Sequence, residues 1–506
     1  MHQLIHNGVL FPAKYEWKRF HVLIKGNQVE LTPEQEEMAV AWVKKLGTDY
    51  VNDKVFAENF FQDFKKALNL NEEADPEDFD FSEIRAYVER EKMRKDILSK
   101  DEKRALAQQR KILREANKEK FGCATVDGEK TEIGNYTAEP SSIFMGRGKH
   151  PLRGRWKQGP TDRDVILNLS PDASTPNGTW KEIVWKPSEM WIAKWEDKLR
   201  GKIKHVWLSD SSCIKQNREI EKFNKAKELE DRMENLKAHI MDNLQSEDIS
   251  RRKIATVCYL IDALKLRVGD EKDRDEADTV GATTLRPQHI TFGPNGKTSF
   301  DFLGKDSVQW HKETDLPDVV IHNLQEFINT AKSSIFKGVR SNNVSSFLGE
   351  AMPGLTAKVF RTYHATKAVK KSLSENEVTS LDPDYVKKHR AVMANLQAAI
   401  ASNHKRTPPK TWHESLEKKM ENLRRQKAKK TKTSLDAVRK LQLNIEEMKA
   451  TRDYNLRTSL KSYIDPRVYY SWGKEKDFDW KLFYPKTLQT KFSWVENTNH
   501  NAKTNS

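Results

Sequence analysis

Two stripes of apolar residues at helical spacing constrain the fold of this chain more than any other feature. The first stripe is Leu416, Met420 and Leu423, and after a short polar break the second is Leu435, Val438, Leu441, Ile445 and Met448. Residues three and four positions apart lie on one face of a helix. Two short helices with one stripe each bury these side chains against one another. We therefore predict an antiparallel coiled-coil hairpin over residues 412–452.

The rest of the chain divides into a mixed N-terminal half and a mainly helical C-terminal half. Alternating runs such as DVILNL and IKHVWL predict strands between residues 163 and 208, and the charged stretch over 81–118 predicts one or two exposed helices. From Asn217 the pattern is helical. SRRKIATVCYLIDALKLRVG is expected to be a core helix that ends just past Arg267, at Gly269.

A small β-region interrupts the helices. Asn295-Gly296 is a strong hairpin signal between two apolar runs, and a second tight turn, Gly304-Lys305-Asp306, places a lysine at its tip. The run GPNGKT resembles the end of a phosphate-binding P-loop, but the leading glycine would fall at Thr291 and no strand-to-helix context follows. We therefore predict a turn here and no nucleotide site.

Charge points to a polyanionic partner. Lys and Arg number 89 against 74 Asp and Glu, which gives a net charge of +15, and nucleic acid is the commonest polyanion. Residues 141–159, SSIFMGRGKHPLRGRWKQG, carry five cations and four glycines but no acid. Glycines let a backbone approach a phosphate, so we favour nucleic-acid contact over an ordinary charged loop.

Other absences narrow the class of protein. Cys123, Cys213 and Cys258 are far apart and lack C-x-x-C spacing, which argues against a disulfide scaffold or a zinc site and for a reducing compartment. No apolar stretch reaches the ~18 residues needed to span a bilayer, and the N-terminus lacks a signal-peptide layout. We find no close carboxylate cluster that would hold Mg²⁺. The expectation is an intracellular protein.

Five scattered segments then match one family in order. They are LKLRVGDEKDRDEADTVGATTLR, FDFLGKDS, GLTAKVFRTYHAT, SNHKRTPPKT and TSLKSYIDPR, and the MGRGKHP loop is similar too. Together they resemble the eukaryotic-type type IB DNA topoisomerases, from near residue 1 to about residue 495. One motif alone would be weak evidence, whereas five in the right order are specific.

The resemblance implies a catalytic set that falls on Arg267, Lys305, Arg361, His404 and Tyr463. The residue types suit transesterification at phosphorus, because a tyrosine phenolate forms a stable covalent link. Each arginine can bind two non-bridging oxygens of the five-coordinate phosphorus, and His404 would donate a further hydrogen bond. Lys305 would protonate the departing 5′-oxygen as general acid. Further DNA contacts are implied for Arg147, Lys149, His150, Arg153, Lys204, Asp306 and Lys358.

The implied activity is relaxation of positive and negative supercoils through a 3′-phosphotyrosyl intermediate, strand swivelling and religation. No cofactor is expected, since the exchange of a phosphodiester for a phosphotyrosine is roughly energy-neutral and four cationic or donor groups supply the charge stabilisation. The expected partner is double-stranded DNA, without membrane or nucleotide, and the enzyme is expected to be a monomer. It would be DNA-associated, in the nucleus of a eukaryote or in the nucleoid of a cell without one.

The fold class that follows is α+β and multidomain, a bi-lobed clamp around DNA with a tyrosine-recombinase-like catalytic lobe. The expected domains are an N-terminal DNA-binding cap at 1–212, a catalytic core at 213–411, the coiled-coil linker at 412–452 and a C-terminal domain at 453–506 that carries Tyr463.

Two departures from the family pattern lie where camptothecin-class poisons bind. Ser462 stands where these enzymes commonly have Asn, and Met145 replaces a common basic residue, so drug sensitivity is in doubt. The chain also lacks the long charged N-terminal extension of nuclear members, and we expect a compact core enzyme.

Two alternatives stay open on the sequence. A tyrosine recombinase shares the Arg/Lys/Arg/His/Tyr chemistry, but usually has a histidine where this chain has Lys358, and His404 follows Arg361 at about twice the usual spacing. A non-enzymatic DNA-packaging protein would fit the charge and the basic loop. It would leave Tyr463 and both arginines unexplained.

Overall fold

The computed structural model describes residues 1–70, 74–146, 148–269, 279–304, 308–375, 378–428 and 432–497. These residues form two compact units, one over Met1–Lys215 and one that begins at Gln216. Both helices and strands are present, so the predicted mixed α/β composition is confirmed. No helix among the described residues is long and apolar enough to cross a membrane.

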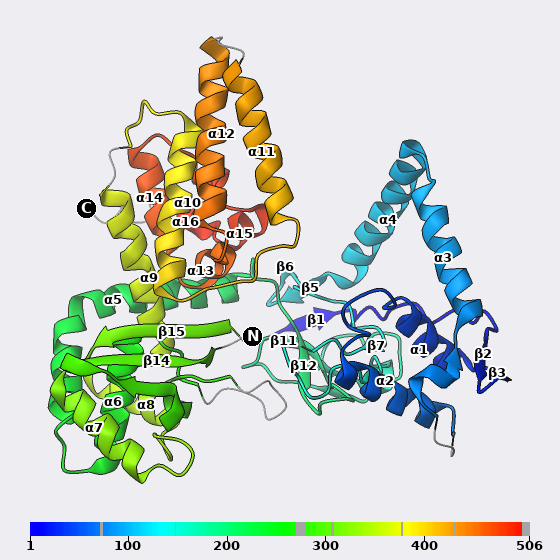
Figure 1. The fold of residues 1–506 in the computed structure, drawn as a ribbon, viewed down its shortest axis with the longest axis horizontal. Coiled ribbons are helices and arrows are strands. Elements are labelled where there is room, and N and C mark those ends of the chain that lie inside the picture. The colour runs from blue at the N-terminus through cyan, green and yellow to red at the C-terminus, as the bar shows by residue number, and fades with distance from the viewer. Residues whose placement is uncertain are drawn as a thin grey trace. The chain divides into compact units, whose positions relative to one another are not determined.

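The described residues of the first unit form four α-helices and several small sheets (Figure 1). Its helices are α1 (Pro33–Val43), α2 (Lys54–Ala67), α3 (Ser82–Asp96) and α4 (Lys100–Phe121). Its strands are β1 (Leu4–His6), β2 (His21–Ile24), β3 (Asn27–Glu30), β4 (Phe79–Asp80), β5 (Cys123–Val126), β6 (Glu129–Glu132), β7 (Ser142–Ile143), β8 (Trp156–Lys157), β9 (Ile166–Asn168), β10 (Glu182–Val184), β11 (Trp191–Glu196) and β12 (Ile203–Trp207).

The strands predicted between residues 163 and 208 form one sheet in the order β10-β9-β11-β12, which confirms the strand pattern. Two smaller sheets have the orders β1-β5-β6 and β3-β2-β4. An aromatic core lies between α1 and α2, where Trp42 stacks on Phe60 with ring centroids 4.5 Å apart. This core fixes α2 and therefore the acidic residues that α2 presents.

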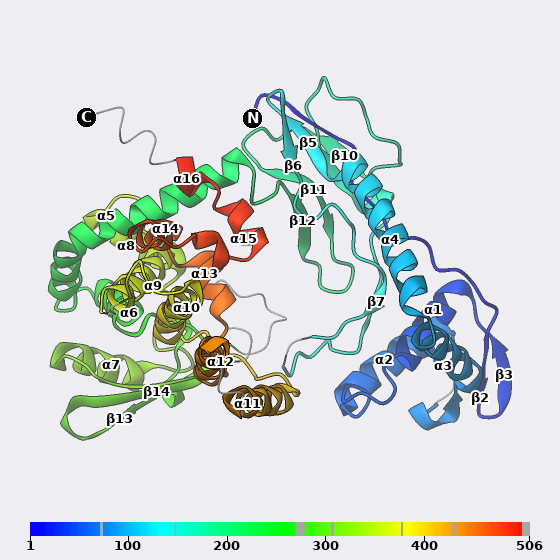
Figure 2. The ribbon, with the colours of Figure 1, turned by 90° about the horizontal axis from the view of Figure 1, so that it is seen from above.

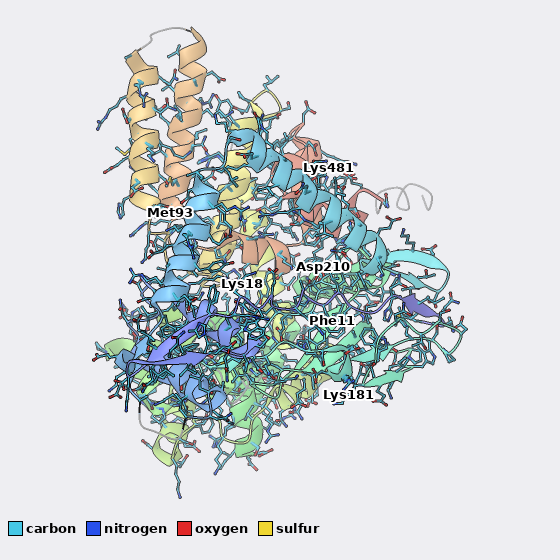
Figure 3. All side chains as sticks on the ribbon, turned by 90° about the vertical axis from the view of Figure 1, so that its right-hand side faces the viewer. Phe11, Lys18, Met93, Lys181, Asp210 and Lys481 are labelled. Carbon is cyan, nitrogen blue, oxygen red and sulfur yellow. The ribbon has the colours of Figure 1, made fainter. Side chains whose placement is uncertain are left out.

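Helices α3 and α4 are exposed, as their charge pattern predicted. Ile84 is the only buried residue described for α3, and α4 has none. Met93 lies far along α3 (Figure 3) with 65% of its surface exposed. The start of α3 packs on the aromatic core through Ile84, with Tyr87 and Val88 beside it, whereas α4 has no buried residue and begins with a capping box formed by Ser99 and Glu102.

The second unit is mainly helical, with one three-stranded sheet in the order β13-β14-β15. Its helices are α5 (Cys213–Asn243), α6 (Ile249–Leu264), α7 (Asp318–Thr330), α8 (Ser341–Ala351), α9 (Ala357–Ser374), α10 (Asp384–Ala401), α11 (Trp412–Ala428), α12 (Lys432–Ala450), α13 (Leu456–Ser462), α14 (Pro466–Glu475), α15 (Lys486–Lys491) and α16 (Trp494–Asn497). Its strands are β13 (Ile290–Phe292), β14 (Lys297–Gly304) and β15 (Val308–Asp315).

Two apolar clusters hold this unit together. One packs α5 to α8 on the sheet, and the other packs α9 and α10 on the short helices α13 to α16. Helices α9 and α10 lie side by side in both views (Figure 1 and Figure 2). Helices α11 and α12 run along each other, and α12 also packs on α10.

Two predictions about this unit have definite outcomes. The Asn295-Gly296 hairpin is confirmed, with β13 and β14 antiparallel and Gly293 N donating to Lys297 O at 2.7 Å. The prediction that this core helix ends just past Arg267, at Gly269, is wrong, because α6 stops at Leu264. Lys265 adopts a left-handed conformation with φ of 60°, and the carbonyls of Arg267 and Val268 bind Ala282 N and Thr283 N instead.

Candidate active site

Three of the predicted catalytic residues converge from three separate elements. Arg361 lies in α9, His404 follows α10, and Tyr463 caps α13. Arg361 Nη2 is 3.0 Å from His404 Nε2, and the guanidinium carbon is 4.6 Å from the centroid of the Tyr463 ring. The rings of His404 and Tyr463 are 5.3 Å apart. All three residues are buried, and Arg361 is only 4% exposed.

Arg361 is buried without a carboxylate partner among the described residues. Its Nη2 donates to the carbonyl of Ser402 at 3.1 Å, while Nε and Nη1 have no acceptor among the described residues. Burial lowers the pKa of Arg361 to about 10, with repulsion from Arg267 adding to the effect, so the guanidinium remains charged at neutral pH. A buried charge with unsatisfied donors is unfavourable unless an anion completes the site. The geometry is therefore that of an anion-binding pocket.

His404 is neutral and its tautomer follows from its neighbour. A guanidinium only donates, so Nε2 of His404 must accept from Arg361 and the proton lies on Nδ1. Burial, with repulsion from Arg361 and Arg267, lowers the pKa of His404 to about 3. Nδ1 has no partner among the described residues. His404 therefore offers one neutral N–H donor, beside the unsatisfied donors of Arg361.

Arg267 lies on irregular backbone beside this cluster. Its charge lowers the pKa values of both Arg361 and His404, which places it within electrostatic reach of them. The loop is held where Gly269 crosses Gly281 so closely that a Cβ on Gly269 would lie 2.7 Å from the Gly281 Cα. Only glycine fits such a crossing. The side chain of Arg267 is exposed, in contrast to that of Arg361.

The backbone around Tyr463 is fixed by buried hydrogen bonds. The hydroxyl of Thr366 in α9 donates to the carbonyl of Tyr463 at 3.3 Å and accepts from Asp465 N at 3.1 Å. In α13, the Ser459 hydroxyl donates to Asn395 Oδ1 at 2.9 Å. Each bond links the segment that carries Tyr463 to α9 or α10, which also position Arg361 and His404.

Two lysines, the buried Lys491 and the partly buried Lys222, bind the last carbonyls of α13. Lys222 of α5 donates to the carbonyl of Ser462 at 3.2 Å, and Lys491 of α15 donates to that of Lys461 at the same distance. Both ammonium groups bind Glu219, at 2.7 and 3.2 Å. Lysines at a helix C-terminus satisfy its unpaired carbonyls. This cluster could not be predicted from the sequence, because Lys222 and Glu219 belong to one evenly charged helix.

Burial also changes the titration of this cluster. Burial lowers the pKa of Lys222 to about 8. Attraction from Glu219 raises this pKa in part, and repulsion from Lys491 and Lys358 lowers it further. Lys358, predicted to contact DNA, is exposed in the first turn of α9. The electrostatic effect on Lys222 shows that Lys358 lies on the side of α9 near the Tyr463 segment.

Three predicted site residues lie outside the described residues. They are Arg147, Lys305 and Asp306. The two strands that flank the predicted Lys305 turn are described, with β14 ending at Gly304 opposite Val308 of β15.

The arginines of the basic loop at residues 141–159 form ion pairs within the first unit, whereas the composition of the loop led us to expect unpaired cations. Arg153 binds both oxygens of Asp53, at 2.7 and 2.9 Å, and Arg155 binds Asp63 at 2.7 Å. A Cβ on Gly154 would lie 2.0 Å from the carbonyl oxygen of Phe56, so this glycine serves internal packing. The loop has no acid of its own, and the compensating carboxylates come from the segment around α2.

The other cations near this loop are also largely paired. Lys157 lies 2.7 Å from Glu139 and 2.9 Å from Asp197, and Lys204 lies 4.0 Å from the same two carboxylates. His150 is buried, with Nδ1 accepting from Leu152 N at 3.1 Å. Lys149 is exposed. The predicted DNA contacts of these residues therefore stay predictions, and Lys149 is the most accessible of them.

Groups of three or more side chains that could hold a metal ion do not occur in the part of the chain that is described. The donors gathered around Tyr463 are cationic or neutral, which suits an anionic ligand such as a phosphodiester.

Comparison with known proteins gives a consistent match along the chain. Residues 1–208 match the eukaryotic DNA topoisomerase I DNA-binding fragment, 211–457 its catalytic core, and 436–504 the C-terminal topoisomerase domain. The chain is 34% identical to DNA topoisomerase 1 beta of Arabidopsis thaliana, over 97% of this chain and 58% of that protein. It is 32% identical to DNA topoisomerase 1 of Drosophila melanogaster, over 97% and 54%, and 31% identical to that of Homo sapiens, over 97% and 70%. It thus spans little more than half the length of the first two relatives.

Proposed function

The chain belongs to the eukaryotic DNA topoisomerase I family, and from this membership we propose that it is a type IB DNA topoisomerase. It would relax positive and negative supercoils by cutting one strand of duplex DNA, allowing rotation and resealing the strand. Family membership sets aside the tyrosine recombinase and DNA-packaging alternatives.

In the proposed reaction, the hydroxyl oxygen of Tyr463 attacks the phosphorus of a backbone phosphodiester. The new bond is a 3′-phosphotyrosyl ester, and the bond to the 5′-oxygen breaks. Lys305 would return a proton to that oxygen, a role that rests on the family resemblance. Religation reverses these steps, with the 5′-hydroxyl as nucleophile. One phosphate ester replaces another, so the reaction would need no ATP.

Charge stabilisation would come from the cluster around Tyr463. The free Nε–H and Nη1–H of Arg361 and the Nδ1–H of His404 are donors without an acceptor among the described residues. A phosphate with two non-bridging oxygens would accept them, and Arg267 would bind from the exposed side. Donors that are already in place stabilise a transition state without reorganisation. On this proposal the reaction proceeds without a metal ion.

The proposal extends to the architecture. We propose that residues 1–212 form a DNA-binding cap, 213–411 the catalytic core, 412–452 a coiled-coil linker and 453–506 the C-terminal domain. The whole would act as a monomeric bi-lobed clamp on DNA in the nucleus or nucleoid. Contacts mostly to phosphates would give weak sequence preference and strong salt dependence.

One structural observation carries the proposal: the buried Arg361 guanidinium lies 4.6 Å from the Tyr463 ring, with no carboxylate partner in the part of the chain that the structure describes. The test is relaxation of negatively and positively supercoiled plasmid in EDTA without ATP, beside the Tyr463→Phe variant. We expect the unmodified chain to relax both substrates and the variant to relax neither. Relaxation by Tyr463→Phe, or none by the unmodified chain, would overturn the assignment.

A further inference from the structure

A cavity in the second unit lies behind the candidate active site and has no part in the proposed reaction. Its volume is about 400 Å³. It is lined by residues of α5, α9 and α14 and by Asp465, the N-cap of α14; the residues that define its chemistry are Phe223, Ala226, Lys227, Tyr363, Lys367 and Val468. This volume lies in the range of small-molecule sites.

The cavity uses a different face of α9 from the catalytic one. Tyr363, Lys367 and Lys370 follow one another at spacings of four and three residues, so they share one helix face. Arg361 precedes Tyr363 by two residues and therefore points to another side of the helix. A ligand of this cavity would not compete with a phosphate at Arg361.

The charges of the cavity do not cancel. Lys370 binds Glu230 at 2.7 Å, and Arg467 binds Asp465 at 2.7 Å, so both carboxylates are paired. Lys367 donates to the hydroxyl of Tyr363 at 2.9 Å and lies 5.3 Å from the centre of its ring. Lys227 and Lys367 form no salt bridge with a described carboxylate, and only longer-range attraction from Glu230 and Glu234 acts on Lys367. Two positive charges therefore remain at the rim.

The floor of the cavity is apolar. Phe223 is 1% exposed, and Ala226 lies one turn along α5 from it. Val468 and the ring of Tyr363 complete the apolar lining. An inorganic anion would gain nothing from this floor, and a neutral apolar molecule would leave the two lysines uncompensated.

We propose that this cavity is a binding site for a small organic anion with a flat apolar body and one or two negative charges. The apolar body would lie on Phe223, Ala226 and Val468. The anionic group would lie between Lys227 and Lys367, where it forms charge-assisted hydrogen bonds.

Occupancy would act on the nucleophile through Thr366. This residue lines the cavity, and its hydroxyl binds both the carbonyl of Tyr463 and the amide of Asp465. A ligand against Thr366 would change how firmly the Tyr463 segment is held. This consequence rests on the proposed function, whereas binding itself does not.

Binding is tested by photo-crosslinking with 4-(3-trifluoromethyl-diazirin-3-yl)benzoic acid, beside its neutral amide, on the full chain. We expect the acid to label peptides that contain residues 223–230, 363–370 and 465–471, and the amide to label them about tenfold less. Lys227→Glu with Lys367→Glu should reduce labelling by the acid by about the same factor. The matched control is Lys371→Glu, since Lys371 pairs with Glu375 and does not line the cavity.

Equal labelling by acid and amide, labelling spread over the surface, or equal loss in the Lys371→Glu control would overturn the site. Labelling should persist in Tyr463→Phe, so a failure of the proposed activity does not affect this result. The link to Tyr463 is tested separately, by the fraction of covalent DNA complex formed with and without saturating benzoic acid probe in the dark. We expect that fraction to change at least twofold. An unchanged fraction in a chain that is labelled at the cavity would disprove the link through Thr366.

Discussion

The arginines of the basic loop, which are partly buried, and the buried arginine of the active site differ in their partners. Arg153 and Arg155 in the first unit each meet a carboxylate at 2.7 Å, from Asp53 and Asp63. Arg361 in the second unit has a carbonyl and a neutral imidazole as its partners, and two of its donors find no acceptor within the described ranges. A cation that is paired with its own anion belongs to the internal contacts of the fold, whereas a buried cation without an anion among the described residues is poised to bind an anionic ligand. Burial alone does not distinguish these roles, but the partner does.

The largest expected effect is that of Arg361→Met. Removing donors aimed at a developing phosphorane should lower single-turnover DNA cleavage by about a thousandfold. Because the side chain is an uncompensated buried charge, the free energy of unfolding should stay unchanged or rise by about 1–2 kcal/mol. Quench-flow cleavage and urea unfolding measure the two quantities. A variant that cleaves normally, or that unfolds far more easily, would give Arg361 the structural role of Arg153.

His404→Ala should have the next largest effect, a loss of about a hundredfold in cleavage. Since the pKa of His404 is about 3, its imidazole donates as a neutral group throughout the range in which the enzyme is stable. His404→Gln, another neutral donor, should therefore recover part of the rate. A cleavage rate that falls as pH rises through 6.5 in the unmodified chain, but not in His404→Gln, would show instead that the imidazolium is required.

The same residue makes a prediction about stability. Its pKa of about 3 in the folded chain lies below the ordinary value of 6.5, so the unfolded chain takes up a proton first as pH falls. The contribution of the neutral His404 to the free energy of unfolding is therefore complete above pH 6.5 and is lost as the pH falls from 6.5 to 3. At pH 5 the loss should be about 2 kcal/mol. His404→Gln should remove that slope, which urea unfolding at pH 7 and pH 5 would show.

The sequence could predict the active site better than the basic loop, for a physical reason. The positions of Arg361, His404 and Tyr463 follow from motifs that the family shares, and the structure brings these three together. The partners of Arg153 and Arg155 come from Asp53 and Asp63, about a hundred residues earlier, and the loop contains no sign of them. Local composition gives the charge of a segment. Only the fold decides which charges meet.

Arg153→Ala should therefore have a smaller effect than the changes at Arg361 and His404, and it should lower stability rather than the cleavage rate. It leaves Asp53 half-buried without its fork of hydrogen bonds, which should lower the free energy of unfolding by about 1–2 kcal/mol. The double variant Asp53→Ala with Arg153→Ala should lose less than the sum of the two single changes. Lys149→Ala, in the same loop but exposed, serves as control: it should leave stability unchanged and weaken DNA binding with a smaller salt slope. Additive losses would mean that the pair contributes nothing.

Lys222→Met should give the smallest effect, because Lys222 acts on Tyr463 only through the backbone. Without the hydrogen bond to the Ser462 carbonyl, the last turn of α13 should be less firmly held, and cleavage should slow about fivefold with DNA affinity unchanged.

Since the pKa of Lys222 is about 8, the charge that strengthens this bond is lost above that pH. The cleavage rate of the unmodified chain should then decline above pH 8, and that of Lys222→Met should not. Lys225→Met, from the same helix, is the control because Lys225 pairs with Glu228 and not with α13. A parallel fall in DNA affinity would instead make Lys222 a phosphate contact, a third kind of buried cation that neither Arg153 nor Arg361 represents.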